Sequence, residues 1–129
     1  MKHSILAAIL LCTVGGCALR EKPVLEVEAA PITFNGGEAE IENRIKSALA
    51  GRGWEIIAEQ PNLIRAQYVK ANAEVGAHSV TIDIPYDADS YSILYVDSEN
   101  MMYDPDAGTI HRNYNRWVAN LQMDIDAPL

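Results

Sequence analysis

Histidine and serine side chains are the groups in this 129-residue chain best suited to proton transfer, nucleophilic attack or metal binding. A zinc site needs three or four converging ligands, and the sequence holds no H-E-x-x-H motif. His78 and Asp83 are an odd number of residues apart, so they point to opposite faces of a strand. Ser98, His111 and an aspartate include the residue types of a serine hydrolase, but no serine lies in a G-x-S-x-G sequence. The sequence therefore predicts no catalytic residue, no metal site and no cofactor.

Acidic side chains gather between positions 97 and 106, where a cation could bind. The sequence DPDAG at 104–108 begins like a calcium loop, but it lacks the third ligand and the bidentate glutamate at the twelfth position. Proline, aspartate and glycine are also the residues that form turns, so we expect an exposed turn here. Gly36 and Gly37 precede no Lys-Ser/Thr pair, which excludes a phosphate-binding loop of the Walker type.

Aromatic residues are concentrated in the C-terminal half of the chain, and they allow two interpretations. They are Tyr86, Tyr91, Tyr95, Tyr103, Tyr114 and Trp117. The commoner use of such residues is at the edge of a core, with the hydroxyl groups reaching water. The alternative is a groove for a small ligand, a peptide or a glycan. The candidate binding residues for that groove are Tyr95, Tyr103, Asn113, Asn115 and Arg116.

The N-terminus has the pattern of a secretory leader. Lys2 precedes an apolar run at 5–11, which is too short for a bilayer span of about 20 residues. The sequence VGGC at 14–17 resembles a bacterial lipobox, in which the cysteine thiol receives a diacylglycerol and the leader is removed just before it. The resemblance implies cleavage between Gly16 and Cys17 and a lipid on Cys17.

The same resemblance gives an expectation for the compartment. Residues 1–16 would be the cleaved leader, and the domain would be held on a lipid bilayer through acylated Cys17. An aspartate next to the cysteine is the usual signal for retention in the inner membrane, and residue 18 is Ala. We therefore expect an outer-membrane anchor in the bacterial cell envelope, with the domain facing the periplasm.

Composition restricts the domain organisation and the partners. The chain has 10 basic and 18 acidic side chains and a net charge of −8, which argues against nucleic acid and against electrostatic docking on an anionic lipid surface. Processing would leave Cys17 as the last cysteine, so no disulfide is expected. Residues 17–33 are predicted to be the lipidated cysteine and a flexible tether, although VLEVE at 24–28 alternates like an edge strand. Residues 34–129 suit one domain.

Hydrophobic periodicity predicts a helix, four strands and a second helix. The first helix covers 35–49, with Asn35 and Glu38 as a capping box. The strands cover 54–59, 63–69, 78–84 and 91–97, each alternating as a strand buried on one side does. The last helix starts at about Ile110 and frays near Asp124, because aspartates oppose the dipole at that end. These elements predict a two-layer α+β sandwich, with an antiparallel meander of about four strands and both helices on one face.

Several segments together resemble small bacterial lipoproteins whose role is not known. They are the lipobox, GW at 53–54, IDIPYD at 82–87, YSILYVDSENMMYD at 91–104 and IHRNYNRWVANL at 110–121. The order of elements is also similar to that of periplasmic accessory lipoproteins of envelope assembly. The resemblance implies a non-enzymatic, structural or protein-interaction module of the envelope, with another envelope protein as partner. A single exposed patch containing Ile57, Val69 and Leu94 would favour that role. A covered sheet face together with a cavity would favour the ligand-binding alternative.

Overall fold

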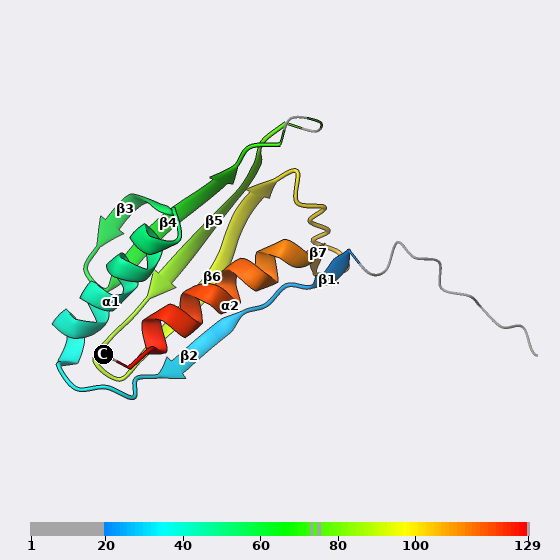
Figure 1. Ribbon diagram of the computed structural model, residues 1–129. Helices are drawn as coiled ribbons and strands as arrows, with labels where there is room; N and C mark the ends of the chain where they lie inside the picture. The colour runs from blue at the N-terminus through cyan, green and yellow to red at the C-terminus, as the bar shows by residue number, and fades with distance from the viewer. Residues whose placement is uncertain (1–19, 73, 75, 129) are drawn as a thin grey trace, which may run out of the picture.

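The computed structural model describes residues 20–72, 74 and 76–128 of the chain (Figure 1). The predicted leader, the Gly16–Cys17 cleavage site and the lipidation site at Cys17 lie outside this part. The elements are β1 (Glu21–Pro23), β2 (Val27–Pro31), α1 (Gly37–Gly51), β3 (Glu55–Gln60), β4 (Leu63–Lys70), β5 (His78–Pro85), β6 (Ser90–Glu99), β7 (Thr109–His111) and α2 (Arg112–Asp126).

The main sheet is antiparallel and has five strands in the order β2-β6-β5-β4-β3, and β1 pairs with β7 in a separate two-stranded sheet. The α+β class and the meander β3–β6 are confirmed, but the predicted number of strands is wrong. The fifth strand, β2, comes from the segment that was expected to be a tether. Turns of few residues connect β3 to β4 and β5 to β6, which brings consecutive strands together as antiparallel neighbours.

The described part of the expected tether, residues 20–33, belongs to the folded body. Val27 and Ala30 of β2 are buried, and both pair with β6. The Asn115 amide of α2 holds the chain just before β2: its Oδ1 accepts from the Leu25 backbone N–H at 2.9 Å, and its Nδ2 donates to the Pro23 carbonyl at 2.8 Å. The expectation of a flexible tether is therefore wrong for these residues. A β-bulge interrupts the alternation in β2, so the sequence pattern there is weak.

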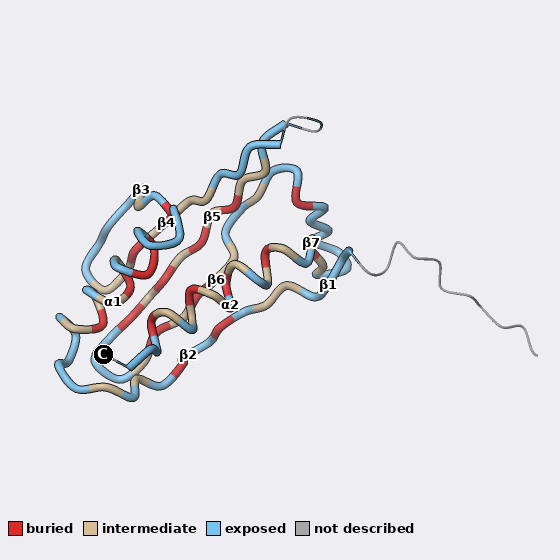
Figure 2. The backbone as a smooth tube through the Cα atoms, viewed as in Figure 1, coloured by how far each residue is buried: buried red, intermediate tan, exposed pale blue. Residues whose placement is uncertain are grey.

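Both helices pack on one face of the sheet, and the core lies between the two layers (Figures 1 and 2). The helices contribute Ile41, Ile45, Ala48, Leu49, Tyr114, Val118, Leu121 and Ile125, and the central strands contribute Ile64, Ala66, Val80, Ile82, Ile84, Tyr91 and Ile93. The strict alternation predicted for the strand at 54–59 is interrupted. A bulge at Ile57 shifts the register of β3, so Ala58 pairs with Arg65 and is exposed.

The N-terminus of α1 differs from the predicted capping box. The helix starts at Gly37 after Gly36, which has a φ of 121° and no side-chain cap. Asn35 is therefore not the cap, and the Glu38 carboxylate accepts a hydrogen bond from Asn62 Nδ2 at 2.7 Å instead. A glycine at position 36 permits a backbone conformation that other residues rarely adopt, and this conformation replaces the expected cap.

The C-terminus of α2 is held by α1 and does not end early. Arg44 Nη1 donates to the carbonyl groups of Ile125, at 3.1 Å, and Ala127, at 2.6 Å. The expected fraying near Asp124 is wrong, because Asp124 forms an ion pair with Arg52 at 2.7 Å and the helix continues to Asp126. Arginine groups from elsewhere in the fold supply the positive charge that this helix end lacks in its own sequence. The start of α2 was also misplaced: Ile110 lies in β7, and the helix begins at Arg112.

The Arg44→Met variant is expected to lower the free energy of unfolding by about 1.5–3 kcal/mol, because the carbonyl groups at the end of α2 lose a charged donor. Urea denaturation followed by circular dichroism measures this change. The control is Lys46→Met on the same helix, which removes exposed ion pairs with Glu42 and Glu59. An equal loss in the two variants would contradict the capping role of Arg44.

Candidate functional site

The candidate binding residues from the sequence do not form one groove. The rings of Tyr95 and Tyr103 stack on each other with their centroids 4.3 Å apart. Asn115 is occupied by the backbone of residues 23 and 25. Arg116 donates a hydrogen bond to Asn113. Of the five candidates, Asn113 lines the principal cavity, together with Trp117 from the same helix face.

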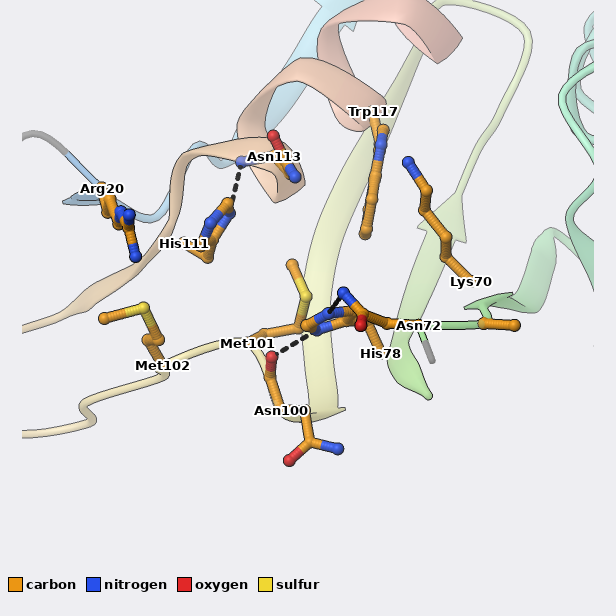
Figure 3. A pocket seen from close by; sticks show the side chains of 11 residues that line it. Arg20, Lys70, Asn72, His78, Asn100, Met101, Met102, His111, Asn113 and Trp117 are labelled. Atoms are coloured by element: carbon orange, nitrogen blue, oxygen red, sulfur yellow. Dashed lines mark hydrogen bonds between the residues drawn. The ribbon is translucent and has the colours of Figure 1, made fainter. Parts of the chain in front are cut away.

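This cavity has a volume of about 620 Å³ and lies where α2 begins, beside β1 and the end of β4 (Figures 1 and 3). Its lining residues are Arg20, Lys70, Ala71, Asn72, His78, Asn100, Met101, Met102, His111, Asn113 and Trp117. They come from the N-terminal segment, β4, β5, the loop after β6, β7 and α2. Most of these segments are distant in the sequence, so the cavity depends on the tertiary fold. Its volume is in the range of small-molecule sites, about 300–1,000 Å³.

The charge of the cavity is opposite to that of the protein. Arg20 and Lys70 line it from opposite sides in Figure 3, and no aspartate or glutamate is among the lining residues. The chain as a whole carries 18 acidic side chains against 10 basic ones. A lining without carboxylates on so acidic a chain favours an anionic occupant.

The ion pairs reinforce this contrast. Some basic residues each pair with a carboxylate away from the cavity: Arg44, Lys46, Arg52 and Arg65. Five further basic residues form no ion pair with any residue that the structure describes. We call these five residues the basic end: Arg20, Lys22, Lys70, Arg112 and Arg116. All of the basic end lies in the cavity lining or in β1 and the first turns of α2. These five basic groups are thus available to an external anion without the loss of an internal ion pair.

Both histidines of the cavity have a defined hydrogen-bond arrangement. His78 Nδ1 lies 2.6 Å from the Asn100 carbonyl, so Nδ1 carries the proton and donates. His78 Nε2 then accepts from Asn72 Nδ2 at 3.4 Å. His111 caps α2, where its Nδ1 accepts from the Asn113 backbone N–H at 3.1 Å. The cap requires an unprotonated Nδ1, so the neutral His111 ring carries its proton on Nε2.

The surroundings of His111 also favour its neutral form. Burial lowers the pKa of His111 below its ordinary value of 6.5, and the positive charges of Arg112, Arg20 and Arg116 lower it further, as does His78 when it is protonated. The same field that opposes a proton on His111 opposes a bound metal cation and favours an anion. Among the described residues, no group of three or more His, Cys, Asp or Glu side chains is placed to hold a metal ion.

Strained backbone forms one wall of the cavity. Asn100 and Met102 have φ values of 56° and 55°, in a region where a long side chain such as that of methionine is rarely found. Hydrogen bonds hold the segment: His111 N–H donates to the Met101 carbonyl at 2.8 Å, and Asn100 Nδ2 donates to the Ala77 carbonyl at 2.8 Å. The result buries Met101 and leaves Met102 exposed at the cavity. Strain of this kind is concentrated at functional sites in proteins.

Trp117 gives the cavity an aromatic wall. Its ring meets Tyr68 edge to face with the centroids 4.9 Å apart, and Tyr68 in turn contacts Trp54 at 5.4 Å. The contact fixes the indole ring before any ligand arrives. With Met101 and Met102, the cavity therefore combines an apolar surface with basic and amide groups.

Sequence reasoning missed most of the cavity. Arg20 was assigned to the tether, Lys70 lay just after a predicted strand, and no binding role was predicted for His78. The available signal was that His78 and His111 each begin a predicted element, but their sequence positions did not show that they share a cavity. Asn113 was among the predicted binding residues, and Trp117 was among the aromatic residues considered for a groove.

No family model, curated protein or solved structure matches this chain. Within the described part of the chain, no helix is both long enough and apolar enough to cross a bilayer. The function must therefore be inferred from the cavity and its surroundings.

The His111→Asn variant tests the protonation state of the cap. Because the pKa of His111 is lowered in the folded state, the unfolded chain binds more protons than the folded one just below pH 6.5. The wild type is therefore expected to lose stability between about pH 7 and about pH 5.5 as His111 in the unfolded state becomes charged. Asparagine caps helices without titrating, so the variant should lose less stability over this range in urea denaturation. Parallel pH profiles for the two proteins would contradict the assignment.

The Tyr114→Phe variant tests whether the tyrosines serve the core. The Tyr114 hydroxyl is fully buried and has no hydrogen-bond partner within the described structure. Its removal is expected to leave the free energy of unfolding unchanged or to raise it by about 1 kcal/mol. The matched control is Tyr91→Phe, which loses a 2.7 Å hydrogen bond to Asp126 and should destabilise the fold. A clear loss of stability in Tyr114→Phe would show that its hydroxyl has a partner.

Proposed function

We propose that this protein is a lipid-anchored, non-enzymatic binding domain of the bacterial cell envelope, and that its cavity binds a small anionic ligand. One observation carries the proposal: the cavity is lined by Arg20 and Lys70 without any carboxylate, and neither residue forms an ion pair with a described residue, whereas Arg44, Lys46, Arg52 and Arg65 do. Unpaired basic groups attract anions without first having to break an internal ion pair. The ligand-binding alternative from the sequence thus has the better support.

The ligand also needs an apolar part. Trp117, Met101 and Met102 present hydrocarbon, aromatic and thioether surface to the cavity, and Arg20 and Lys70 stand at its sides. An anion with an attached apolar or aromatic group would use both. The Asn72 and Asn113 amides add polar groups that can orient such a ligand.

Binding rather than catalysis is the role that the histidines support. Nδ1 of each ring is already engaged with the backbone of the protein, at Asn100 and at Asn113. Ser98 Oγ shares its hydrogen bond with the Tyr95 hydroxyl at 2.7 Å, so it pairs with a phenol and not with a histidine. We therefore assign His78 and His111 to shaping the cavity.

A protein-contact role through the open sheet face is the second candidate. Ile57, Val69 and Val96 are exposed, at 47%, 56% and 37%. The strand register separates them, because Val69 lies opposite Ser79 and the Arg65–Asp83 ion pair occupies the centre of this face. Leu94, half-buried, lies opposite Asp83. The face is therefore open, but its apolar residues do not form the single patch that would favour this role.

The anchor is part of the proposal. Acylated Cys17 would hold the domain on a bilayer, with the outer membrane and the periplasmic side favoured because Ala18 follows the cysteine. Multiple acyl chains, each contributing about 0.8 kcal/mol per buried methylene, give a stable anchor.

Calorimetry with a matched pair of probes tests the cavity. The acylated protein is held in nanodiscs of neutral phosphatidylcholine and titrated with 2-naphthyl phosphate or with uncharged 2-naphthol, with empty nanodiscs as the reference. The phosphate is expected to bind about tenfold more tightly or better, because it gains charge-assisted contacts. The Lys70→Ser variant should weaken phosphate binding by roughly tenfold and leave naphthol unchanged.

The control variant is Lys22→Ser, which removes an unpaired lysine of the basic end that does not line the cavity. It should change phosphate binding by less than about twofold. Equal binding of the two probes, or an equal effect of the two lysine variants, would contradict an anion site in the cavity.

A further inference from the structure

We infer that the anionic ligand is the headgroup of a phospholipid with a net negative charge, in the same bilayer that holds the anchor. This inference rests on the proposed function and names its ligand class. The observation behind it is that Arg20 lines the cavity and is also the third residue after Cys17. One short segment therefore carries both the lipid attachment point and a wall of the binding site.

The distance between anchor and cavity is limited by covalent geometry. Three residues span at most about 11 Å when fully extended. The polar headgroup layer on each side of a bilayer is about 5–8 Å deep. A lipid on Cys17 would therefore keep Arg20 at or just above the headgroups.

Backbone contacts among the described residues hold Arg20 beside the cavity. The Arg20 carbonyl accepts a hydrogen bond of 2.7 Å from the Arg112 backbone N–H. The next residues form β1, where Glu21 lies opposite His111 and Lys22 opposite Ile110. The segment is thus held at the cavity wall from Arg20 onward, so an anchor at Cys17 would bring the cavity close to the membrane.

The charge distribution fits a single headgroup better than a charged surface. The net charge of −8 opposes attraction of the whole domain to an anionic bilayer. The basic end is the exception, and within it Arg20 and Lys70 are the residues that line the cavity. A phosphodiester whose headgroup carries no ammonium of its own gains two basic partners between them, while the acidic remainder of the domain stays away from the lipid.

The remaining walls suit the rest of a phospholipid. Trp117 is of the residue type that proteins place at the membrane–water interface, where its ring is apolar and its N–H remains hydrated. Met102 is 47% exposed at the cavity and offers a flexible apolar contact for glycerol and the first acyl methylenes. Arg20, Lys70, Asn72, Asn100 and Met102 are all exposed, so the mouth of the cavity is accessible from outside.

Hydrogen exchange on the full acylated protein tests the inference. The protein is reconstituted in vesicles of phosphatidylcholine alone or of phosphatidylcholine with phosphatidylglycerol, and backbone exchange is followed by mass spectrometry. Amides of residues 70–72, 100–102 and 111–117 are expected to exchange more slowly only when phosphatidylglycerol is present. In the Lys70→Ser and Arg20→Ser variants, the phosphatidylglycerol content needed for half of this protection should rise about tenfold. Lys22→Ser should resemble the wild type, and slow exchange in β5 confirms that each variant is folded.

Soluble 2-naphthyl phosphate added to phosphatidylcholine vesicles separates the two proposals. Protection by phosphatidylglycerol that depends on Lys70 but not on Lys22 supports the lipid headgroup. Protection by the soluble phosphate without any effect of phosphatidylglycerol overturns the headgroup and leaves the anion site intact. Absence of protection by either ligand overturns both proposals. If Lys22→Ser loses as much protection by phosphatidylglycerol as Lys70→Ser does, the effect is a diffuse electrostatic one, and this result also overturns the headgroup proposal.

Discussion

The attachment of the N-terminal segment to the last helix is the constraint on which the rest of this structure depends. The Asn115 amide bridges the backbone of residues 23 and 25, and β1 pairs with β7 immediately before α2 begins. These contacts align β2 with β6, and β2 becomes the edge strand that completes the five-stranded sheet. They also place Arg20 against the cavity. A chain that kept its core but lost this attachment would lose a sheet edge and one wall of the site together.

Basic residues have different roles at the two ends of the molecule. Away from the cavity, arginine and lysine stabilise the layers: Arg44 holds the end of α2, and Arg52 holds Asp124. At the basic end, the cationic groups have no carboxylate partner in the described structure. Like charges kept close together raise the energy of the free protein, and an anion would lower it.

The cavity is pre-formed by the backbone to a large extent. Positive φ values at Asn100 and Met102 place the loop after β6, and two histidines fix it through Asn100 and Met101. The Trp117–Tyr68–Trp54 contacts hold the aromatic wall. A site whose rings and loop are already held in place loses little conformational entropy when a ligand enters. This favours binding of a small group, such as a phosphate, that can form few contacts with the protein.

The sequence by itself determined the elements whose pattern is local: the helical stripe of Ile41, Ile45 and Leu49, the four alternating strands β3–β6 and the two-layer α+β class. Periodicity records which face of an element is buried, so it was sufficient for these. The tertiary structure alone decided that residues 20–33 join the fold, that Gly36 and not an Asn35 cap starts α1, and that Arg44 prevents fraying of α2. It also decided the site. Arg20, Lys70, His78 and Trp117 are far apart in the chain, and only the folding of the strands and helices brings them to one cavity.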